Sequence, residues 1–421
     1  MGSLLRYLWV VAAVLLCAGV SAMADQRAFS SRYYQIHTDI DSSLAADLAR
    51  RMDAMYDEYA RRLQRYSANP QRPMVEAFLF SDQDDYMLFV GPGMRSTGGA
   101  FMPARNALTA VLAGQGRDTL RRTLQHEAFH QFAYNVIEQD LPTWLNEGIA
   151  QYFEEGLWVG NGFITGQIPP RRVRQLQADI KAGRLMDFEK FMKMSPDTWA
   201  MALKSRSQSR GATQYNQAWA MVQYLLSAND PLGKPMRHRV VKMLDMIHDG
   251  KDADQAFAEA FSANYKGFND RFLDWAGKLQ ATDEASYIEH MGVLGDMLVA
   301  MDGYGKAFGD IEPFRKDVEK AQLEIRYSKG QIKWSSGKDT NLYFRRLGGE
   351  PFAPADLLLQ PRRGSPLPDI VCRCLPNIVL RTRFYTAGDH IEHELLIESS
   401  DPTTGRIMAS PFLPTVTTPK K

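Results

Sequence analysis

The 421-residue chain has few cysteines, no excess of either charge and only one long apolar run. Its 3 cysteines are too few for a disulfide-scaffolded domain. The 50 basic and 49 acidic residues give a net charge of +1, which argues against a nucleic-acid partner. Low-complexity segments and runs of like charge are missing too. A hydrophobic content of 45% and a charged content of 24% are typical of a globular protein.

The one long apolar run lies at the N-terminus. Arg6 precedes the apolar residues 8–20, and the sequence Ala-Met-Ala at 22–24 matches a small-x-small cleavage site. This layout predicts a signal peptide over residues 1–24 and export to the periplasm or the medium. An uncleaved anchor is the alternative, but a span needs about 20 apolar residues and this run is shorter. We expect no membrane span after cleavage.

Cys372 and Cys374 are the two cysteines that remain after signal cleavage. Export permits a disulfide, but a Cys-x-Cys bridge closes a small and strained ring. The pair is interpreted either as two small apolar residues on a strand or as a redox or bridging pair. Both interpretations stay open at this point.

The first half of the chain predicts strands followed by helices. Strands are expected at 31–38, at 75–80 and, as a strand–turn–strand unit, at 98–112. An apolar stripe at spacings of three and four residues predicts a helix between the first two strands. A helix without proline or glycine is expected at 117–137, and a second at about 143–155. The pattern then stays mostly helical to about residue 280.

The sequence pattern changes from helical to strand-like beyond residue 280. Alternation around Lys329-Gly330 predicts a hairpin at 323–336, and strands are expected at 370–386 and 390–399. The proline-rich segment 351–368 is interpreted as a loop. The predicted fold class is therefore α+β, with one domain over 25–285 and a smaller β-rich C-terminal region over 310–421.

The segment His-Glu-Ala-Phe-His at 126–130 carries the strongest chemical signal. On a helix, His126 and His130 lie one turn apart on one face and can bind one ion. Glu127 lies about 100° around the helix axis from His126, so it can reach a water molecule at that ion. The spacing therefore predicts two zinc ligands and a general base on one rigid element.

A catalytic zinc needs a third protein ligand, and Glu147 is the candidate. It lies 17 residues after His130 in Trp-Leu-Asn-Glu-Gly, which leaves room for one helix to end and another to begin. Gly148 and Ala150 are small, which lets the second helix approach the first closely. Gln151, one turn beyond Glu147, is interpreted either as a partner of a ligand histidine or as a solvated polar residue.

The segments HEAFH and WLNEGIAQYFE together resemble the gluzincin metallopeptidases, and most closely the peptidase MA-like secreted bacterial proteins, many of which carry only a domain of unknown function. The resemblance covers about residues 30–280. It implies a zincin-like core with a small twisted sheet, an active-site helix and a helical subdomain. It also implies Zn²⁺ held by His126, His130 and Glu147, with Glu127 as the general base.

The resemblance suggests two further features. Tyr215 matches a tyrosine that lies ahead of a helix in related peptidases and stabilises the oxyanion; packing at a helix start is the alternative. The strand at 98–103 corresponds to the edge strand that pairs with substrate. The aminopeptidase N family has an acidic residue there, whereas this chain has Met102-Pro103. This departure favours an endopeptidase or a lost exopeptidase anchor.

Other histidines are weaker candidates. His390 and His393 are three residues apart in an alternating segment, so they are expected on opposite sides of a strand. His37 follows an apolar strand and is expected to have a polar neighbour.

The sequence therefore predicts an exported zinc metallopeptidase that acts on a peptide or protein substrate. Glu127 would transfer the proton of the attacking water, and Tyr215 would stabilise the oxyanion. The alternative is a zinc-stabilised envelope binding protein, catalytically weak or inactive, that keeps the peptidase-like scaffold.

Overall fold

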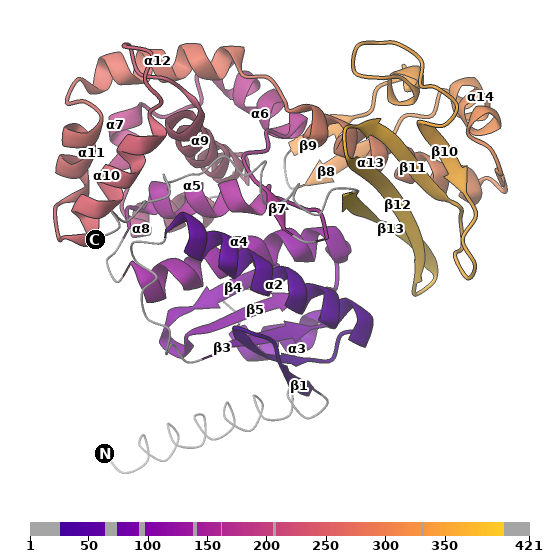
Figure 1. Ribbon diagram of the computed structural model, residues 1–421, viewed down its shortest axis with the longest axis horizontal. Helices are drawn as coiled ribbons and strands as arrows, with labels where there is room; N and C mark the ends of the chain where they lie inside the picture. The colour runs from indigo at the N-terminus through magenta and orange to yellow at the C-terminus, as the bar shows by residue number, and fades with distance from the viewer. Residues whose placement is uncertain are drawn as a thin grey trace, which may run out of the picture. The chain divides into compact units, whose positions relative to one another are not determined.

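A computed structural model describes residues 26–63, 74–91, 97–137, 141–160, 162–204, 208–329 and 332–399 (Figure 1). The chain is a mixed α+β protein with a β-rich C-terminal region, as the sequence predicts. Internal contacts divide it into two compact units, residues 1–136 and 137–421. The predicted signal peptide, 1–24, lies outside the described residues. No helix among the described residues is long and apolar enough to cross a membrane.

The first unit contains a five-stranded sheet in the order β1-β2-β3-β5-β4. Its strands are β1 (Arg27–Ser30), β2 (Tyr34–Thr38), β3 (Val75–Phe80), β4 (Gly99–Met102) and β5 (Ala107–Val111). Strands β2, β3 and β5 are parallel, whereas β1 and β4 form antiparallel edges. The strands predicted in this part of the chain are present, although residues 31–33 form the turn between β1 and β2.

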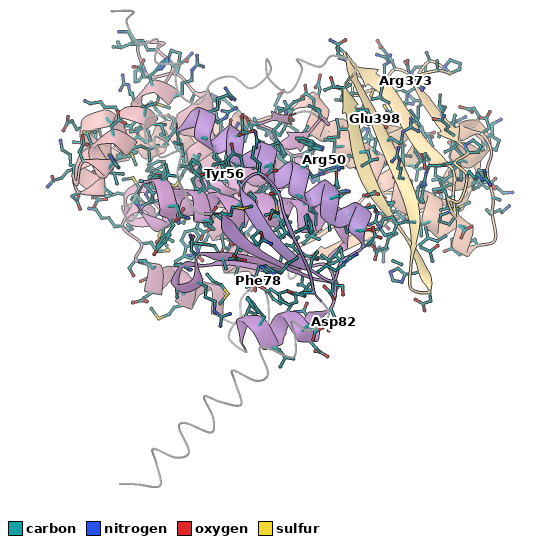
Figure 2. The ribbon with its side chains drawn as sticks, turned by 60° about the horizontal axis from the view of Figure 1, so that its bottom comes forward. Arg50, Tyr56, Phe78, Asp82, Arg373 and Glu398 are labelled. Atoms are coloured by element: carbon teal, nitrogen blue, oxygen red, sulfur yellow. The ribbon has the colours of Figure 1, made fainter. Side chains whose placement is uncertain are left out.

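One face of this sheet packs against the short helix α3 (Gln83–Val90). Phe78 and Phe80 of β3 alternate toward this face and form an apolar cluster with Tyr86 and Phe89 of the helix. The helix begins at Asp82, whose carboxylate accepts backbone N–H groups of the first turn. Figure 2 labels Phe78 and Asp82.

Two long helices, α2 (Ser42–Arg62) and α4 (Gly116–Val136), pack on each other and on strands of the same sheet. The predicted helix at 117–137 is therefore confirmed as α4. The approach of α4 to β4 requires a glycine, because a Cβ at Gly99 would lie 2.5 Å from the Thr123 side chain and 2.8 Å from the Thr109 carbonyl oxygen. Gly99 thus brings the edge strand close to the helix that carries the two histidines.

The second unit begins with a helical part built around α9 (Gln208–Ser227). This helix packs against five others in the described chain (Figure 1). The helices of this part are α5 (Thr143–Glu154), α6 (Pro170–Lys181), α7 (Phe188–Met192), α8 (Pro196–Lys204), α10 (Arg237–His248), α11 (Ala253–Ala260) and α12 (Tyr265–Lys278). The predicted second helix is confirmed as α5, and the mostly helical pattern to residue 280 is confirmed with it. A small hairpin, β6 (Leu157–Trp158) and β7 (Phe163–Ile164), follows α5.

The C-terminal part is a four-stranded antiparallel sheet that packs against the helix α13 (Asp283–Gly303). Its strands are β10 (Leu357–Gln360), β11 (Asp369–Leu375), β12 (Ile378–Ala387) and β13 (His390–Ser399). The strands predicted at 370–386 and 390–399 are confirmed. The loop predicted at 351–368 is wrong in part, because Leu357–Gln360 pairs with β11 as an edge strand. The prolines flank this strand, so they leave its ladder intact.

The hairpin predicted around Lys329 is confirmed as β8 (Arg326–Lys329) and β9 (Ile332–Ser335). The helix α14 (Ile311–Ala321) and the 3₁₀ turn η4 (Thr340–Phe344) complete this part. Cys372 and Cys374 are free thiols on β11, where a register irregularity interrupts pairing with β12 between Cys372 and Leu375. Cys372 belongs to the apolar core that α13 shares with the sheet.

Candidate metal centre

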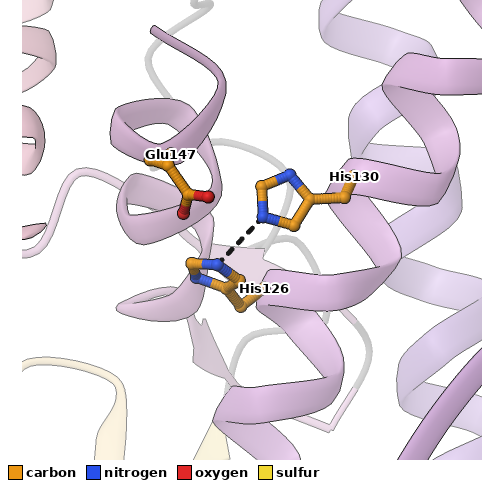
Figure 3. Close-up of side chains that lie close together, drawn as sticks. All are labelled: His126, His130 and Glu147. Carbon is orange, nitrogen blue, oxygen red and sulfur yellow. Dashed lines mark hydrogen bonds between the residues drawn. The ribbon is translucent and has the colours of Figure 1, made fainter. Parts of the chain in front are cut away.

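Three predicted ligands come together in the structure. His126 and His130 project from one side of α4, with their Nε2 atoms 3.0 Å apart, and Glu147 comes from α5 (Figure 3). One donor atom of each residue lies within 4.8 Å of the others. This is the one cluster of its kind that could hold a metal ion among the described residues.

The donor set fits a zinc ion chemically. Two imidazoles and one carboxylate are ligands that zinc accepts, and three protein ligands are typical of a catalytic site. Tetrahedral bonds of about 2.1 Å place donors about 3.4 Å apart. The histidine pair is slightly closer than this, and no two of the three donor atoms lie more than 4.8 Å apart.

The helix α4 is fixed at the level of the histidines by contacts with α2. The hydroxyl of Tyr59 donates to the carbonyl oxygen of Gln125 at 2.5 Å, and its ring packs on Phe129 and Phe132. One turn earlier, Arg121 donates to Asp47 of α2 at 3.0 Å. Because these groups are buried or half-buried, they restrict rotation of α4 and hold the direction in which both histidines point.

Glu127 lies beside this row and contacts the edge strand. Its Oε2 atom accepts the backbone N–H of Phe101 on β4 at 2.8 Å. Glu127 also affects the hydroxyl of Tyr86. Burial raises the pKa of Tyr86, and the negative charge of Glu127 raises it further. The predicted base is therefore oriented by a main-chain donor, which sequence reasoning did not identify because the contact joins residues 26 positions apart.

Glu147 is positioned by the close packing of α5 on α9. The adjacent Gly148 faces the carbonyl oxygen of Ala218, and a Cβ there would lie 2.5 Å from it. The sequence predicts that Gly148 lets α5 approach the first helix, α4; this is wrong about the partner helix, because the atoms nearest a Cβ at Gly148 belong to α9. The Glu147 side chain is half-buried.

Gln151 has a different partner from either one considered from the sequence. It is buried, and its Oε1 atom accepts a hydrogen bond from Arg172 at the start of α6. Arg172 also donates to Glu155, and its guanidinium lies 5.2 Å from the ring centre of Trp219 on α9. This buried charge network fixes α5 against α6 and α9. No short motif marks Arg172, so the sequence could not assign it.

Tyr215 lies inside α9 rather than ahead of a helix. The sequence placed the helix start too late, because residues 208–214 already belong to it. The Tyr215 ring contacts Trp199 of α8 edge-to-face, with centroids 5.5 Å apart. Its role at an oxyanion stays a prediction.

The remaining candidate histidines have polar partners. His393 contacts Asp296 of α13 at 2.9 Å, and Tyr327 donates to the same carboxylate at 2.6 Å. His390 is exposed and contacts Asp389 and Glu392. Their different partners agree with the expected opposite sides of β13. His37 contacts Glu76 at 2.6 Å, as expected for a polar neighbour.

Comparison with protein families gives a match over part of the chain. Residues 121–232 match the family model described as "Protein of unknown function (DUF1570)". No curated protein matches the chain. The matched segment runs from the turn before His126 to just beyond α9. It therefore contains the three candidate ligands, Glu127 and Tyr215.

Proposed function

We propose that the chain is an exported zinc-dependent metallopeptidase with a zincin-like core. One observation carries the proposal: two histidines and a glutamate converge, and a second glutamate, Glu127, lies beside them on the same helix turn. Export rests on the predicted signal peptide. The substrate is a peptide or protein.

The zincin-like assignment is supported by the sheet of the first unit. Its edge strand β4 is antiparallel to β5, whereas the central strands are parallel. The helix α4 packs against β4 and β5, and Glu127 binds the backbone of β4. An edge strand next to the proposed base is where an extended peptide can add as a further strand.

The proposed chemistry divides among named groups. His126, His130 and Glu147 would hold the zinc ion, which when bound supplies Lewis acidity that polarises a carbonyl group and acidifies water. Glu127 takes the proton of the attacking water and passes it to the leaving amine. The N–H group of Phe101 keeps the carboxylate oriented for this transfer. Tyr215 is assigned to the oxyanion, as an uncharged donor.

The direct test is Glu127→Gln, which keeps the shape of the side chain but removes its basicity. We expect full zinc content by elemental analysis and a loss of peptide hydrolysis of about 10²–10⁴-fold. Glu259→Gln is the matched control, since Glu259 is an exposed helix residue paired with Lys242 and Lys251. Retained hydrolysis in Glu127→Gln would reject the assignment of the base.

A binding function without catalysis has one observation in its favour. A cavity of about 490 Å³ in the C-terminal part is lined by α14, η4, β10 and the segment between η4 and β10, including Phe344, Phe352 and Leu358. A mixed peptide library offered to the mature protein, with and without chelator, separates the two functions. Cleavage that chelator abolishes supports the peptidase, whereas retention of intact peptides supports the binding protein.

A further inference from the structure

The hydrogen-bonding pattern of β4 shows which of its backbone groups point outward. The N–H of Val111 donates to the carbonyl of Gly98 at 3.0 Å, so these two residues form a hydrogen-bonded pair. Such pairs alternate along antiparallel strands. In the observed register, Gly99 and Phe101 therefore occupy the other positions, and their N–H and C=O groups point away from β5. The Phe101 N–H bond to Glu127 agrees with this direction.

The side chain of Phe101 lies on the α4 face of the sheet. Residues two apart on a strand share a face, and Gly99 of the same strand faces Thr123 of α4. The Phe101 ring meets the ring of Tyr134 on α4, with centroids 5.5 Å apart and an interplanar angle of 58°. The same strand position thus supplies a main-chain donor to Glu127 and an aromatic side chain beside it.

Tyr134 continues the row of candidate ligands along α4. It lies one helical turn beyond His130 and two beyond His126, and residues four apart lie on one side of a helix. Its side chain is 56% exposed, so most of the ring does not contribute to the core. The side-chain amide of the next residue, Asn135, donates a hydrogen bond to the side chain of Asn106, in the turn after β4, at 2.8 Å. This bond fixes the helix end relative to the strand.

We propose that Phe101 and Tyr134 form a subsite for a large apolar side chain, aromatic or branched aliphatic, of a peptide extended along β4. This inference rests on the proposed peptidase function. A peptide that pairs with the outward N–H and C=O of Gly99 and the outward C=O of Phe101, whose N–H stays on Glu127, alternates its side chains between the two faces of the sheet. The side chain on the α4 face then meets the two rings, and because the backbone of Phe101 also binds Glu127, that side chain belongs to a residue near the scissile bond.

The subsite predicts both a cleavage preference and the residue that causes it. The zinc-loaded protein should cut a mixed peptide library beside Phe, Tyr or Leu. In a pair of matched peptides with Phe or Ala at that position, Tyr134→Ala should lower kcat/KM for the Phe peptide by about 10–100-fold. The Ala peptide should be affected little. Tyr134→Phe should retain the preference, because it keeps the ring.

Leu88→Ala is the matched control, since Leu88 is a similarly exposed apolar residue (55%) on α3, away from α4. A second readout does not depend on turnover. Calorimetry measures the binding of both peptides to the zinc-loaded Glu127→Gln protein and to the same protein that also carries Tyr134→Ala. Tighter binding of the Phe peptide that disappears in Tyr134→Ala supports the subsite. No difference between the peptides, or equal effects of Tyr134→Ala and Leu88→Ala, overturns it. Absence of cleavage by the wild-type protein overturns the peptidase instead, and the binding comparison still decides the subsite.

Discussion

At the residue scale, His290 of α13 is a titratable group in an apolar setting. Its ring packs against Tyr343 and Tyr287, and its Nδ1 atom is buried with no hydrogen-bond partner among the described residues. Burial lowers the pKa of His290 from 6.5 to about 4, and the charge of Glu289 opposes this only in part. The folded chain therefore holds this histidine neutral under mildly acidic conditions.

This depressed pKa predicts a loss of stability in acid. Below about pH 6.5 the unfolded chain binds a proton at His290, whereas the folded chain does not until about pH 4. The free energy of unfolding is therefore unaffected by His290 well above pH 6.5, and it decreases as the pH falls from 6.5 toward 4. By pH 5 we expect a decrease of about 2 kcal/mol in the free energy of unfolding.

Urea unfolding at pH 7.5 and pH 5.0 measures this decrease. His290→Leu serves as the comparison, because leucine cannot titrate and its absolute stability does not enter the difference between the two pH values. The variant should lose less stability than the wild-type chain over this range. Equal losses in both proteins would show that another group causes the pH dependence.

At the element scale, the contact between α5 and α9 determines where Glu147 lies. A Cβ at position 148 would lie 2.5 Å from the Ala218 carbonyl oxygen and 2.6 Å from Val222. The carbonyl belongs to a helix backbone and cannot move alone, so the two helices must separate to admit even a methyl group.

Gly148→Ala should therefore destabilise the protein by about 1–3 kcal/mol, as overpacking does. Zinc affinity should fall as well, because Glu147 precedes this position. Gly292→Ala in α13 is the matched control: a Cβ at Gly292 meets nothing within 4 Å, and alanine in a helix is favoured over glycine by about 0.5–1 kcal/mol. Thermal unfolding and zinc titration of both variants measure these effects. Equal behaviour of the two would contradict the packing argument.

At the scale of the whole molecule, metal binding and folding should be linked. A ligand that binds only the folded chain raises the free energy of unfolding by about 2.7 kcal/mol when its free concentration is 100 times its dissociation constant. We therefore expect Tm to rise with added zinc and to fall with chelator. In His130→Ala the response should be lost, because one of three donors is removed.

His390→Ala makes the same substitution at an exposed histidine of β13 outside the cluster. It should keep the full zinc response in differential scanning calorimetry. An unchanged response in His130→Ala, or a loss in both variants, would place the metal elsewhere.

The sequence by itself determined the features that depend on spacing along one helix or one strand. His126, Glu127 and His130 have their relative directions as soon as residues 116–136 form a helix, because 3.6 residues complete a turn. The alternating segment 390–399 became β13 for a similar reason. Glu147 could be named because its distance along the chain leaves room for one helix reversal.

Tertiary structure alone decided the contacts between distant segments. These contacts are the hydrogen bond from the Phe101 N–H to Glu127, the hydrogen bond from Arg172 to Gln151 and the ring contact between Tyr134 and Phe101. Tertiary structure also turned part of a proline-rich segment into the edge strand β10 and placed Tyr215 inside α9. Local propensity carries no information about which strand or helix becomes a neighbour, because that choice depends on how the whole chain buries its apolar faces.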